Sequence, residues 1–325
     1  MFLSKQLYHC RFSSVGIAGN KKCVFEVHGF IIAHQVLIVY NKNMRTEEQM
    51  YDLILQIAQG DERIRAVYMN GSRTNKNAPK DIFQDYDIVY VVKETAPFIQ
   101  DKTWINKFGE ISFMQYPDES PYFPSDKENS YGYLMIFKDG NRIDLTLQSE
   151  PYAKVHIIDD KLCKILLDKD NLLPQIPQAT DEDYHVQKPT EEQFLSSCNE
   201  FWWCLNNVAK GLWRGELPYV NDMLSFVLRK ELEKLISWKI GIKTDFSVSV
   251  GKSAKYMYKW ISEEEYKTYL STYSCGSVED CREATCRMIK LFSDTAKDVA
   301  KALNFKYNLE EEKASVEYLQ KTQAM

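Results

Sequence analysis

The sequence lacks the patterns that mark several common classes of protein. Its eight cysteines form no C-x-x-C pair, which excludes the usual zinc-knuckle spacing, and scattered single cysteines are typical of reduced thiols in a cytosolic protein. The longest apolar run, Phe30 to Tyr40, contains His34 and Gln35 and is too short to cross a bilayer. No basic start followed by an apolar stretch and a small-residue cleavage site is present. We therefore expect a soluble, cytoplasmic protein that does not bind a membrane.

The chain also lacks an excess of positive charge. Its net charge is −5 and its isoelectric point is about 5.7. Broad nucleic-acid binding depends on Lys and Arg neutralising phosphates, so this acidic balance argues against a nucleic-acid partner and favours a cationic small molecule. A P-loop is absent as well, because Gly251-Lys252-Ser253 would need a glycine at the position of Phe246. What remains is ordinary globular composition, 44% hydrophobic and 27% charged, in 325 residues, which is enough for two domains.

Residues 1–43 differ in character from the rest of the chain. Their apolar and polar residues follow no sustained period, whereas from Met44 onward a capping box of Thr46 and Gln49 precedes apolar residues at helical spacing. We hypothesise that Met44 is the natural start and that residues 1–43 are an extension. A genuine edge strand at 30–40 is the alternative. An inactive or unfolded product after deletion of 1–43 would contradict the extension hypothesis.

The region that follows is predicted to mix α and β structure. The segment from Asp85 to Val92 has strong strand character, and Asp139-Gly140 is a hairpin turn signal between two further strands. The predicted strands are 64–69, 85–92, 133–137 and 142–147. The fold class we expect is α+β, beginning with a domain at 44–175 that contains a mixed sheet and flanking helices.

Beyond this region the pattern becomes helical. A linker with three prolines and an acidic cluster spans 168–190, and the spacing after it predicts a C-terminal helical bundle over 176–325. The run Glu263-Glu264-Glu265 is interpreted as a solvated helix start, and the polar tail after 307 is expected to fray. The predicted helices are 191–213, 218–240, 253–270 and 278–303.

Three carboxylates carry the chemistry that we predict. Asp85 and Asp87 lie two apart in a strand, so both point to one face, and Asp144 lies on the polar face of another predicted strand. If the two strands are neighbours, the three carboxylates converge, and their mutual repulsion favours a bound cation. Hard oxygen ligands that leave positions open for phosphate suit Mg²⁺, which can activate an attacking oxygen and neutralise a leaving pyrophosphate. An isolated Asp-x-Asp would more often be a solvated face.

A small-residue turn precedes this strand. Gly71-Ser72-Arg73 follows the strand predicted at 64–69 and lies fourteen residues before Asp85. Glycine lets a phosphate approach the backbone, and Ser72 offers both a hydroxyl and an N–H group. A helix beginning here would favour anions. Together with Asp144, this turn shifts our interpretation of the two aspartates from a solvated face to a catalytic site.

The combination resembles the DNA polymerase β-like nucleotidyltransferases, and more narrowly the aminoglycoside 6-adenylyltransferases that inactivate streptomycin. The resemblance covers about Met44 to Tyr307 and leaves residues 1–43 without a counterpart. One departure is Asn70, where the family leads us to expect glutamate. The matching segments are Met44 to Glu47, Asp61 to Arg65, Gly71 to Thr74, Phe83 to Ile88, Ile143 to Leu147, Lys161-Leu162, Asn199 to Trp202, Ile236 to Lys239 and Val250 to Lys252.

The resemblance implies roles for the residues of the turn and the strands. Asp85 and Asp87 would hold Mg²⁺, and Asp144 would complete the site either as a metal ligand or as the general base for a sugar hydroxyl. Gly71, Ser72 and Arg73 would hold the triphosphate of ATP. The resemblance identifies residues 44–175 as a nucleotidyltransferase domain.

The helical region would supply the remaining contacts. Lys252 and Lys255 either reach the phosphates or lie on an ordinary helix surface. Asp222 and Glu216 match acidic positions of the family and would bind the guanidinium groups of streptomycin in paired hydrogen bonds, with helix capping as their alternative. We favour Asp222 over Glu216. The tryptophans of this region are interpreted mostly as core residues, although any one of them could stack on a guanidinium group.

The function that follows is Mg²⁺-dependent transfer of AMP from ATP to an aminoglycoside hydroxyl, expected to be the 6-hydroxyl of streptomycin, with release of pyrophosphate and antibiotic resistance as the result. ATP would bind the first domain, the drug would bind between the two domains, and the enzyme is expected to be a monomer. One rival keeps the chemistry but uses a protein or tRNA acceptor. The other is a non-catalytic protein that binds nucleotide or drug, which the complete set of carboxylates disfavours.

Overall fold

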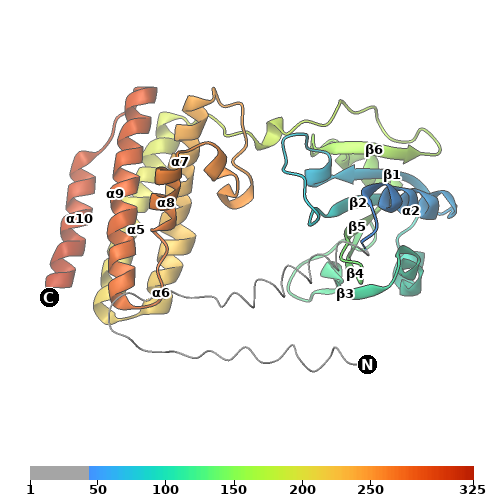
Figure 1. Ribbon diagram of the computed structural model, residues 1–325, viewed down its shortest axis with the longest axis horizontal. Helices are drawn as coiled ribbons and strands as arrows, with labels where there is room; N and C mark the ends of the chain where they lie inside the picture. Colours follow the sequence, from blue (N-terminus) through green and yellow to red (C-terminus); the bar gives the residue numbers. More distant parts are fainter. Residues whose placement is uncertain (1–43) are drawn as a thin grey trace.

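The computed structural model describes residues 44–325. Both interpretations of residues 1–43, as an extension or as an edge strand, lie outside this part of the chain. Within it a sheet region and a helical region lie at opposite ends of the long axis (Figure 1). No helix in the described part is long and apolar enough to cross a membrane.

The first region is built around one mixed sheet of six strands in the order β3-β4-β5-β2-β1-β6. The neighbours β2 and β5 run parallel, whereas all other pairs are antiparallel. Within residues 44–325 this confirms the α+β class. The strands are β1 Ile64–Asn70, β2 Tyr86–Val92, β3 Ile111–Gln115, β4 Ser130–Phe137, β5 Arg142–Ser149 and β6 Cys163–Asp168.

Each face of the sheet has its own apolar core. On one face, alternate residues of β1, β2, β4 and β5 pack with α2, α3 and a 3₁₀ segment at 102–108. On the other, Tyr68, Val89 and Val91 pack with α4. The capping box of Thr46 and Gln49 begins α2 as predicted. The helices are α2 Glu47–Gln59, α3 Ala96–Gln100 and α4 Glu150–His156.

The second region is a helical bundle around a separate core. Phe201 and Phe292, on two of its longest helices, stack with ring centroids 3.6 Å apart. A π-helix, Met223–Leu228, lies between α6 and α7, which together cover the helix predicted at 218–240. The helices are α5 Glu191–Arg214, α6 Leu217–Asp222, α7 Arg229–Lys243, α8 Glu263–Leu270, α9 Val278–Leu303 and α10 Leu309–Ala324.

Two predictions for the helical region were wrong. The helix predicted at 253–270 forms only over α8, because Ser253 and Ala254 have positive φ angles that break a right-handed helix. The acidic run at 263–265 does begin α8, capped by Ser262. The tail after 307 does not fray: it forms α10, which packs along α5 and buries Leu319.

The linker passes from one region to the other at His185. Before it, Asp181 accepts hydrogen bonds from Asn77 (3.0 Å) and His185, and the Asp183 carboxylate pairs with Lys161 at 2.8 Å in the sheet region. Immediately after it, the N–H of Val186 donates to Val248 in the helical region. We keep the domain division at 175/176 as a proposal, and this change of contacts ten residues later defines where the helical region begins to hold the chain.

Candidate active site

Strand register brings the predicted carboxylates to the same edge of the sheet. Asp87 in β2 lies directly beside Asp144 in the parallel strand β5. Their strand neighbours Ile88 and Leu145 point into the core on the α2 side, so both aspartates occupy the opposite face. Asp85 immediately precedes β2, and its side chain is 32% exposed.

A glycine turn presses against this group. Gly71 follows β1 with φ of +76° and begins a single 3₁₀ turn, Gly71–Arg73. A Cβ atom added to Gly71 would lie 2.0 Å from the Oδ2 atom of Asp87, which is shorter than any real contact. Glycine is therefore required here for two reasons, its backbone angle and the close approach of a carboxylate.

An arginine that we did not predict lies among the carboxylates. Arg142 donates to both oxygens of Asp144, at 2.7 and 2.6 Å, and its Nη1 atom lies 3.2 Å from Asp85. Arg142 and Asp144 are two apart in β5 and share a face, so the pattern Arg-x-Asp in a strand could have predicted their contact. In the described part of the chain, no three His, Cys, Asp or Glu side chains are placed to hold a metal ion. The predicted convergence is therefore seen as an Asp87–Asp144 pair and an arginine that links Asp144 to Asp85.

Burial and mutual repulsion shift the proton equilibria of two aspartates. The pKa of Asp87 is raised to about 6, mainly by burial and then by the charges of Asp144 and Asp85. The pKa of Asp85 is also raised, by burial first, while Arg142 and Lys255 act in the opposite direction. Such a site gains from a cation, because a positive charge among these oxygens removes the repulsion. The donor chemistry therefore fits Mg²⁺, provided that Arg142 leaves Asp85 and Asp144.

Arg73 contacts the backbone at the start of β2 rather than the carboxylates of the site. Its guanidinium donates to the carbonyls of Gln84 (2.8 Å) and Asp85 (3.0 Å), and it stacks on the ring of Tyr86 at 3.6 Å. The Gln84 amide in turn donates weakly to Ser72 at 3.4 Å. This network ties the glycine turn to the entry of β2. The triphosphate role expected for Gly71, Ser72 and Arg73 stays a prediction.

Asn70, the departure from the resembled family, lies at the site. It is paired with Asp87 across β1 and β2, and its Oδ1 atom is buried without a hydrogen-bond partner among the described residues. A neutral amide therefore lies beside Asp87, and this edge of the sheet carries one negative charge less than it would with a glutamate at position 70.

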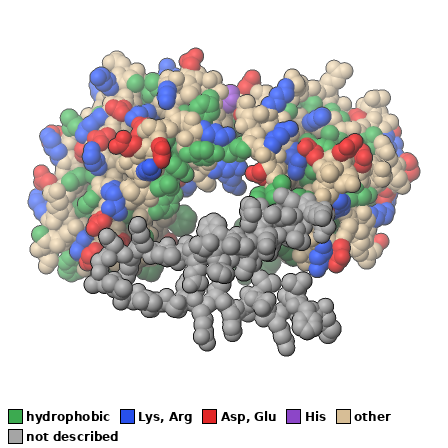
Figure 2. Space-filling model, viewed as in Figure 1, with side chains coloured by type: hydrophobic (Ala, Val, Ile, Leu, Met, Phe, Trp, Pro, Cys, Tyr) green, Lys and Arg blue, Asp and Glu red, His purple; other side chains and the backbone are tan. Residues whose placement is uncertain are grey.

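One of the two predicted lysines approaches the carboxylates. Lys255 is among the positive charges that lower the pKa of Asp85, so this residue of the helical region lies within electrostatic range of the sheet edge. Lys252 begins a short 3₁₀ turn, Lys252–Ala254, on the same loop rather than a helix. Figure 2 shows an opening between the sheet and helical regions, with Lys and Arg side chains along its upper margin.

The two acidic residues predicted to bind the drug lie on the helical region, and no helix cap or short ion pair with a described residue accounts for either of them. Glu216 and Asp222 are both exposed at the two ends of α6, and neither side chain caps a helix. Glu216 makes a long ion pair of 3.8 Å with Arg214, and Asp222 forms no ion pair with any described residue. The capping alternative is thereby removed, while drug binding by either residue stays a prediction.

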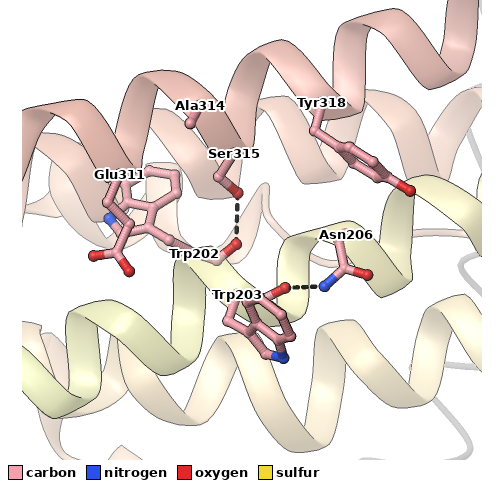
Figure 3. Close-up of a pocket in the computed structure, with 7 residues that line it drawn as sticks. All are labelled: Trp202, Trp203, Asn206, Glu311, Ala314, Ser315 and Tyr318. Atoms are coloured by element: carbon pink, nitrogen blue, oxygen red, sulfur yellow. Dashed lines mark hydrogen bonds between the residues drawn. The ribbon is translucent and has the colours of Figure 1, made fainter.

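A cavity elsewhere does not belong to this site. It measures about 370 Å³ and lies between α5 and α10, where Figure 3 shows Trp203 and Tyr318 on its walls. None of its lining residues comes from the sheet region, and Trp203 is 69% exposed.

Comparison with known proteins gives the family. A sequence model of the family described as streptomycin adenylyltransferase matches residues 44–322. An aminoglycoside 6-adenylyltransferase of Campylobacter jejuni is 42% identical over 84% of this chain and 94% of its own length. Another from Bacillus subtilis (strain 168) is 37% identical over 81% of this chain and 93% of its own.

A solved structure is also similar. The crystal structure of an aminoglycoside 6-adenyltransferase from Bacillus subtilis aligns with a TM-score of 0.44 and 31% identity, covering 87% of this chain and 100% of that chain. The family match and the sequence relatives are sufficient by themselves. The chain is a nucleotidyltransferase and belongs to the streptomycin adenylyltransferase family.

Proposed function

We propose that this enzyme transfers AMP from ATP to a hydroxyl group of an aminoglycoside, that the acceptor is the 6-hydroxyl of streptomycin, and that this confers resistance. The relatives are named aminoglycoside 6-adenylyltransferases, which supports adenylyl transfer to this class of drug. The observation that carries the proposal is the pairing of Asp87 with Asp144 beside the Gly71 turn. Acidic oxygens next to a close backbone turn suit a divalent cation and a triphosphate together.

Asp85 and Asp87 would hold Mg²⁺, with Asp144 beside them. The bound ion would neutralise charge on the phosphates and on the departing pyrophosphate. The Ser72 hydroxyl would hydrogen-bond a phosphate oxygen, and Arg73 keeps the Asp85 backbone in place for this arrangement. Lys255 would approach the same phosphates from the helical region.

Asp144 has two candidate roles, metal ligand and general base, and these give different measurements. As a ligand, Asp144→Asn weakens the binding of Mn²⁺, used as a probe for Mg²⁺. As a base only, the same variant binds Mn²⁺ normally and loses kcat. Its parallel neighbour Asp87 is the reference, because Asp87→Asn is expected to weaken Mn²⁺ binding in either case.

The drug would lie between the two regions. Streptomycin carries guanidinium groups, and a free carboxylate can bind a guanidinium in two parallel hydrogen bonds. Asp222, which has no ion-pair partner among the described residues, is the residue that we favour for this contact, and Glu216 is the second. Asp222→Asn should raise the KM for streptomycin about tenfold and leave the KM for ATP unchanged.

The decisive experiment is mass spectrometry of streptomycin after incubation with enzyme, ATP and Mg²⁺. A mass gain of one AMP on the drug, absent with Asp85→Asn, supports the proposal, and fragmentation or NMR locates the modified hydroxyl. Parallel reactions contain other aminoglycosides, tRNA and protein as acceptors. Labelled AMP on tRNA or protein, with none on any aminoglycoside, would replace the proposal with the rival acceptor. Binding of drug without pyrophosphate release would favour the non-catalytic alternative.

A further inference from the structure

Arg142 forms the densest set of charged contacts at the sheet edge. Its guanidinium holds Asp144 through two hydrogen bonds of 2.7 and 2.6 Å and reaches Asp85 at 3.2 Å. A guanidinium fork facing a carboxylate is the strongest common geometry of this kind, because both N–H groups point along the oxygen lone pairs. Arg142 therefore already occupies oxygen atoms of Asp85, which the proposed function assigns to a metal ion, and of Asp144, for which it keeps the roles of metal ligand and general base open.

The charges around Arg142 show why its contacts with the carboxylates compete with the binding of a divalent cation. Asp85, Asp87 and Asp144 would leave three negative charges at one edge, and Arg142 offsets part of that charge without a metal. Arg142 cannot lose its proton under ordinary conditions, so it remains a full competitor for a divalent cation. A cation that takes the same oxygen atoms of Asp85 and Asp144 displaces the guanidinium and leaves it without an anion.

We propose that Arg142 couples the binding of metal to the binding of ATP: its guanidinium holds Asp85 and Asp144 until a divalent cation takes them, and it then pairs with the triphosphate. This inference rests on the proposed function. The side chain of Arg142 is 40% exposed, so it has room to leave its present partners. A phosphate offers the fork the same oxygen pair that a carboxylate does.

The nearby arginine is not free to take this role. Arg73 is only 9% exposed in its side chain, and the Gln84 and Asp85 carbonyls and the Tyr86 ring hold it. Among residues 44–325, Arg142 is held only by the carboxylates of Asp144 and Asp85. Metal binding alone therefore loses the ion pairs of Arg142. Bound ATP offsets this loss because its phosphates give the guanidinium a new partner, so each ligand should strengthen the binding of the other.

The test measures Mn²⁺ affinity of the full-length protein by electron paramagnetic resonance, with and without a non-hydrolysable ATP analogue. In wild type, the analogue should tighten Mn²⁺ binding. In Arg142→Gln, Mn²⁺ alone should bind about threefold to tenfold more tightly than in wild type, because a competing ion pair is gone. The same variant should bind the analogue more weakly, and the analogue should tighten Mn²⁺ binding less than in wild type.

A matched control is Arg65→Gln. Arg65 also forms a two-bonded pair with a carboxylate, Asp170, at 2.6 Å for each bond, on the same sheet but among different partners. This variant should leave Mn²⁺ affinity and its response to the analogue unchanged. If thermal unfolding shows that Arg142→Gln is unfolded, Arg142→Lys serves in its place, since it keeps the charge but loses the fork, and it should show a smaller change in the same direction.

Two results separate this inference from the proposed function. Unchanged or weaker Mn²⁺ affinity in folded Arg142 variants, while wild type binds Mn²⁺ and the analogue normally, overturns the coupling role and leaves the adenylyltransferase proposal intact. Wild-type protein that binds no Mn²⁺ even with the analogue present overturns both.

Discussion

At position 71 the surroundings allow only glycine. Its φ angle of +76° and the 2.0 Å approach of Asp87 to the place of a Cβ atom act together. Gly71→Ala should therefore lower kcat at least tenfold, because Asp87 must move, and reduce the free energy of unfolding by about 1 to 3 kcal/mol. Steady-state kinetics and urea unfolding measure the two effects.

Gly215 provides the comparison for that substitution. It has nearly the same backbone angle, φ +71°, but nothing lies within 4 Å of where its Cβ atom would be. Gly215→Ala should show only the backbone cost, about 1 kcal/mol, and normal Mn²⁺ binding. Equal losses of kcat in both variants would mean that the contact with Asp87 is not what restricts Gly71.

Asp87 makes the metal-free protein less stable as the pH rises. Its pKa is about 6 in the folded protein and near 3.8 in an unfolded chain, so the folded state binds the proton more tightly. The stability that protonation provides is present at low pH and is lost as the pH rises from about 4 through 6. Asp87→Asn should therefore be more stable than wild type at pH 7.5, with a smaller difference at pH 5, although we expect it to be inactive.

Thermal unfolding in EDTA checks this sign, and added Mg²⁺ at pH 7.5 should raise the Tm of wild type but not of Asp87→Asn. Asp170→Asn is a useful contrast, because its partner Arg65 lowers the pKa of Asp170 and the pH dependence has the opposite direction. A wild-type protein whose stability advantage over Asp87→Asn grows with pH would contradict the assignment.

At the scale of whole elements, α10 packs on the helical bundle and should contribute to its stability. Leu319 is 4% exposed against the bundle core, and Ser315 hydrogen-bonds the Trp202 carbonyl of α5 (Figure 3). Leu319→Ala should cost about 2 to 3 kcal/mol in urea unfolding, because a buried side chain leaves a cavity. Its neighbour Tyr318 is 45% exposed, and Tyr318→Ala should stay within about 0.5 kcal/mol of wild type. Similar small losses in both would mean that α10 unfolds separately.

Elements with a regular pattern were predictable, and irregular ones were not. The helices α5 and α9 fall within a residue of their predicted bounds, because their apolar residues recur at helical spacing over many turns. Strand β3 escaped prediction, since its residues are mostly exposed and show no alternation. The helix expected at 253–270 failed on two residues with positive φ, Ser253 and Ala254, which have no sequence signal comparable to glycine.

The site was predicted in part for similar reasons. Strand alternation predicted a shared face for Asp85 and Asp87 and the polar face of its own strand for Asp144, and the capping patterns identified helix starts. The pairing of β2 with β5 is a long-range fact that no local pattern contains, and the contacts of Arg142 and Arg73 depend on it. Metal binding and drug contacts stay predictions, because they depend on ligands as well as on the chain.

At the scale of the whole molecule, Asp181 holds the linker between the two regions against the sheet region. This 6% exposed carboxylate accepts hydrogen bonds from Asn77 and His185, and more weakly from Asn75, in the loop that follows the glycine turn. Asp181→Ala should lower the free energy of unfolding by about 1 to 3 kcal/mol, because the hydrogen bonds to this buried carboxylate are lost. Hydrogen exchange should become faster at residues 75–78.

Asp183 tests whether that effect is specific. It lies two residues away, is 41% exposed and pairs with Lys161 at 2.8 Å. Asp183→Ala should cost clearly less stability than Asp181→Ala and leave exchange at 75–78 unchanged, as expected for a solvent-exposed ion pair. Faster exchange at 75–78 in both variants would assign the effect to the linker in general rather than to Asp181.

The parallel pairing of β2 and β5 has a consequence for how this enzyme can vary. A slip of one residue between these strands would turn Asp144 toward the opposite side of the sheet, and a slip of two would carry it roughly 7 Å along the strand. The exposed part of the intervening chain can change in length as long as it returns β5 in this alignment. Insertions in the exposed segment 121–124 should therefore be tolerated, whereas a single residue added inside β5 should abolish activity.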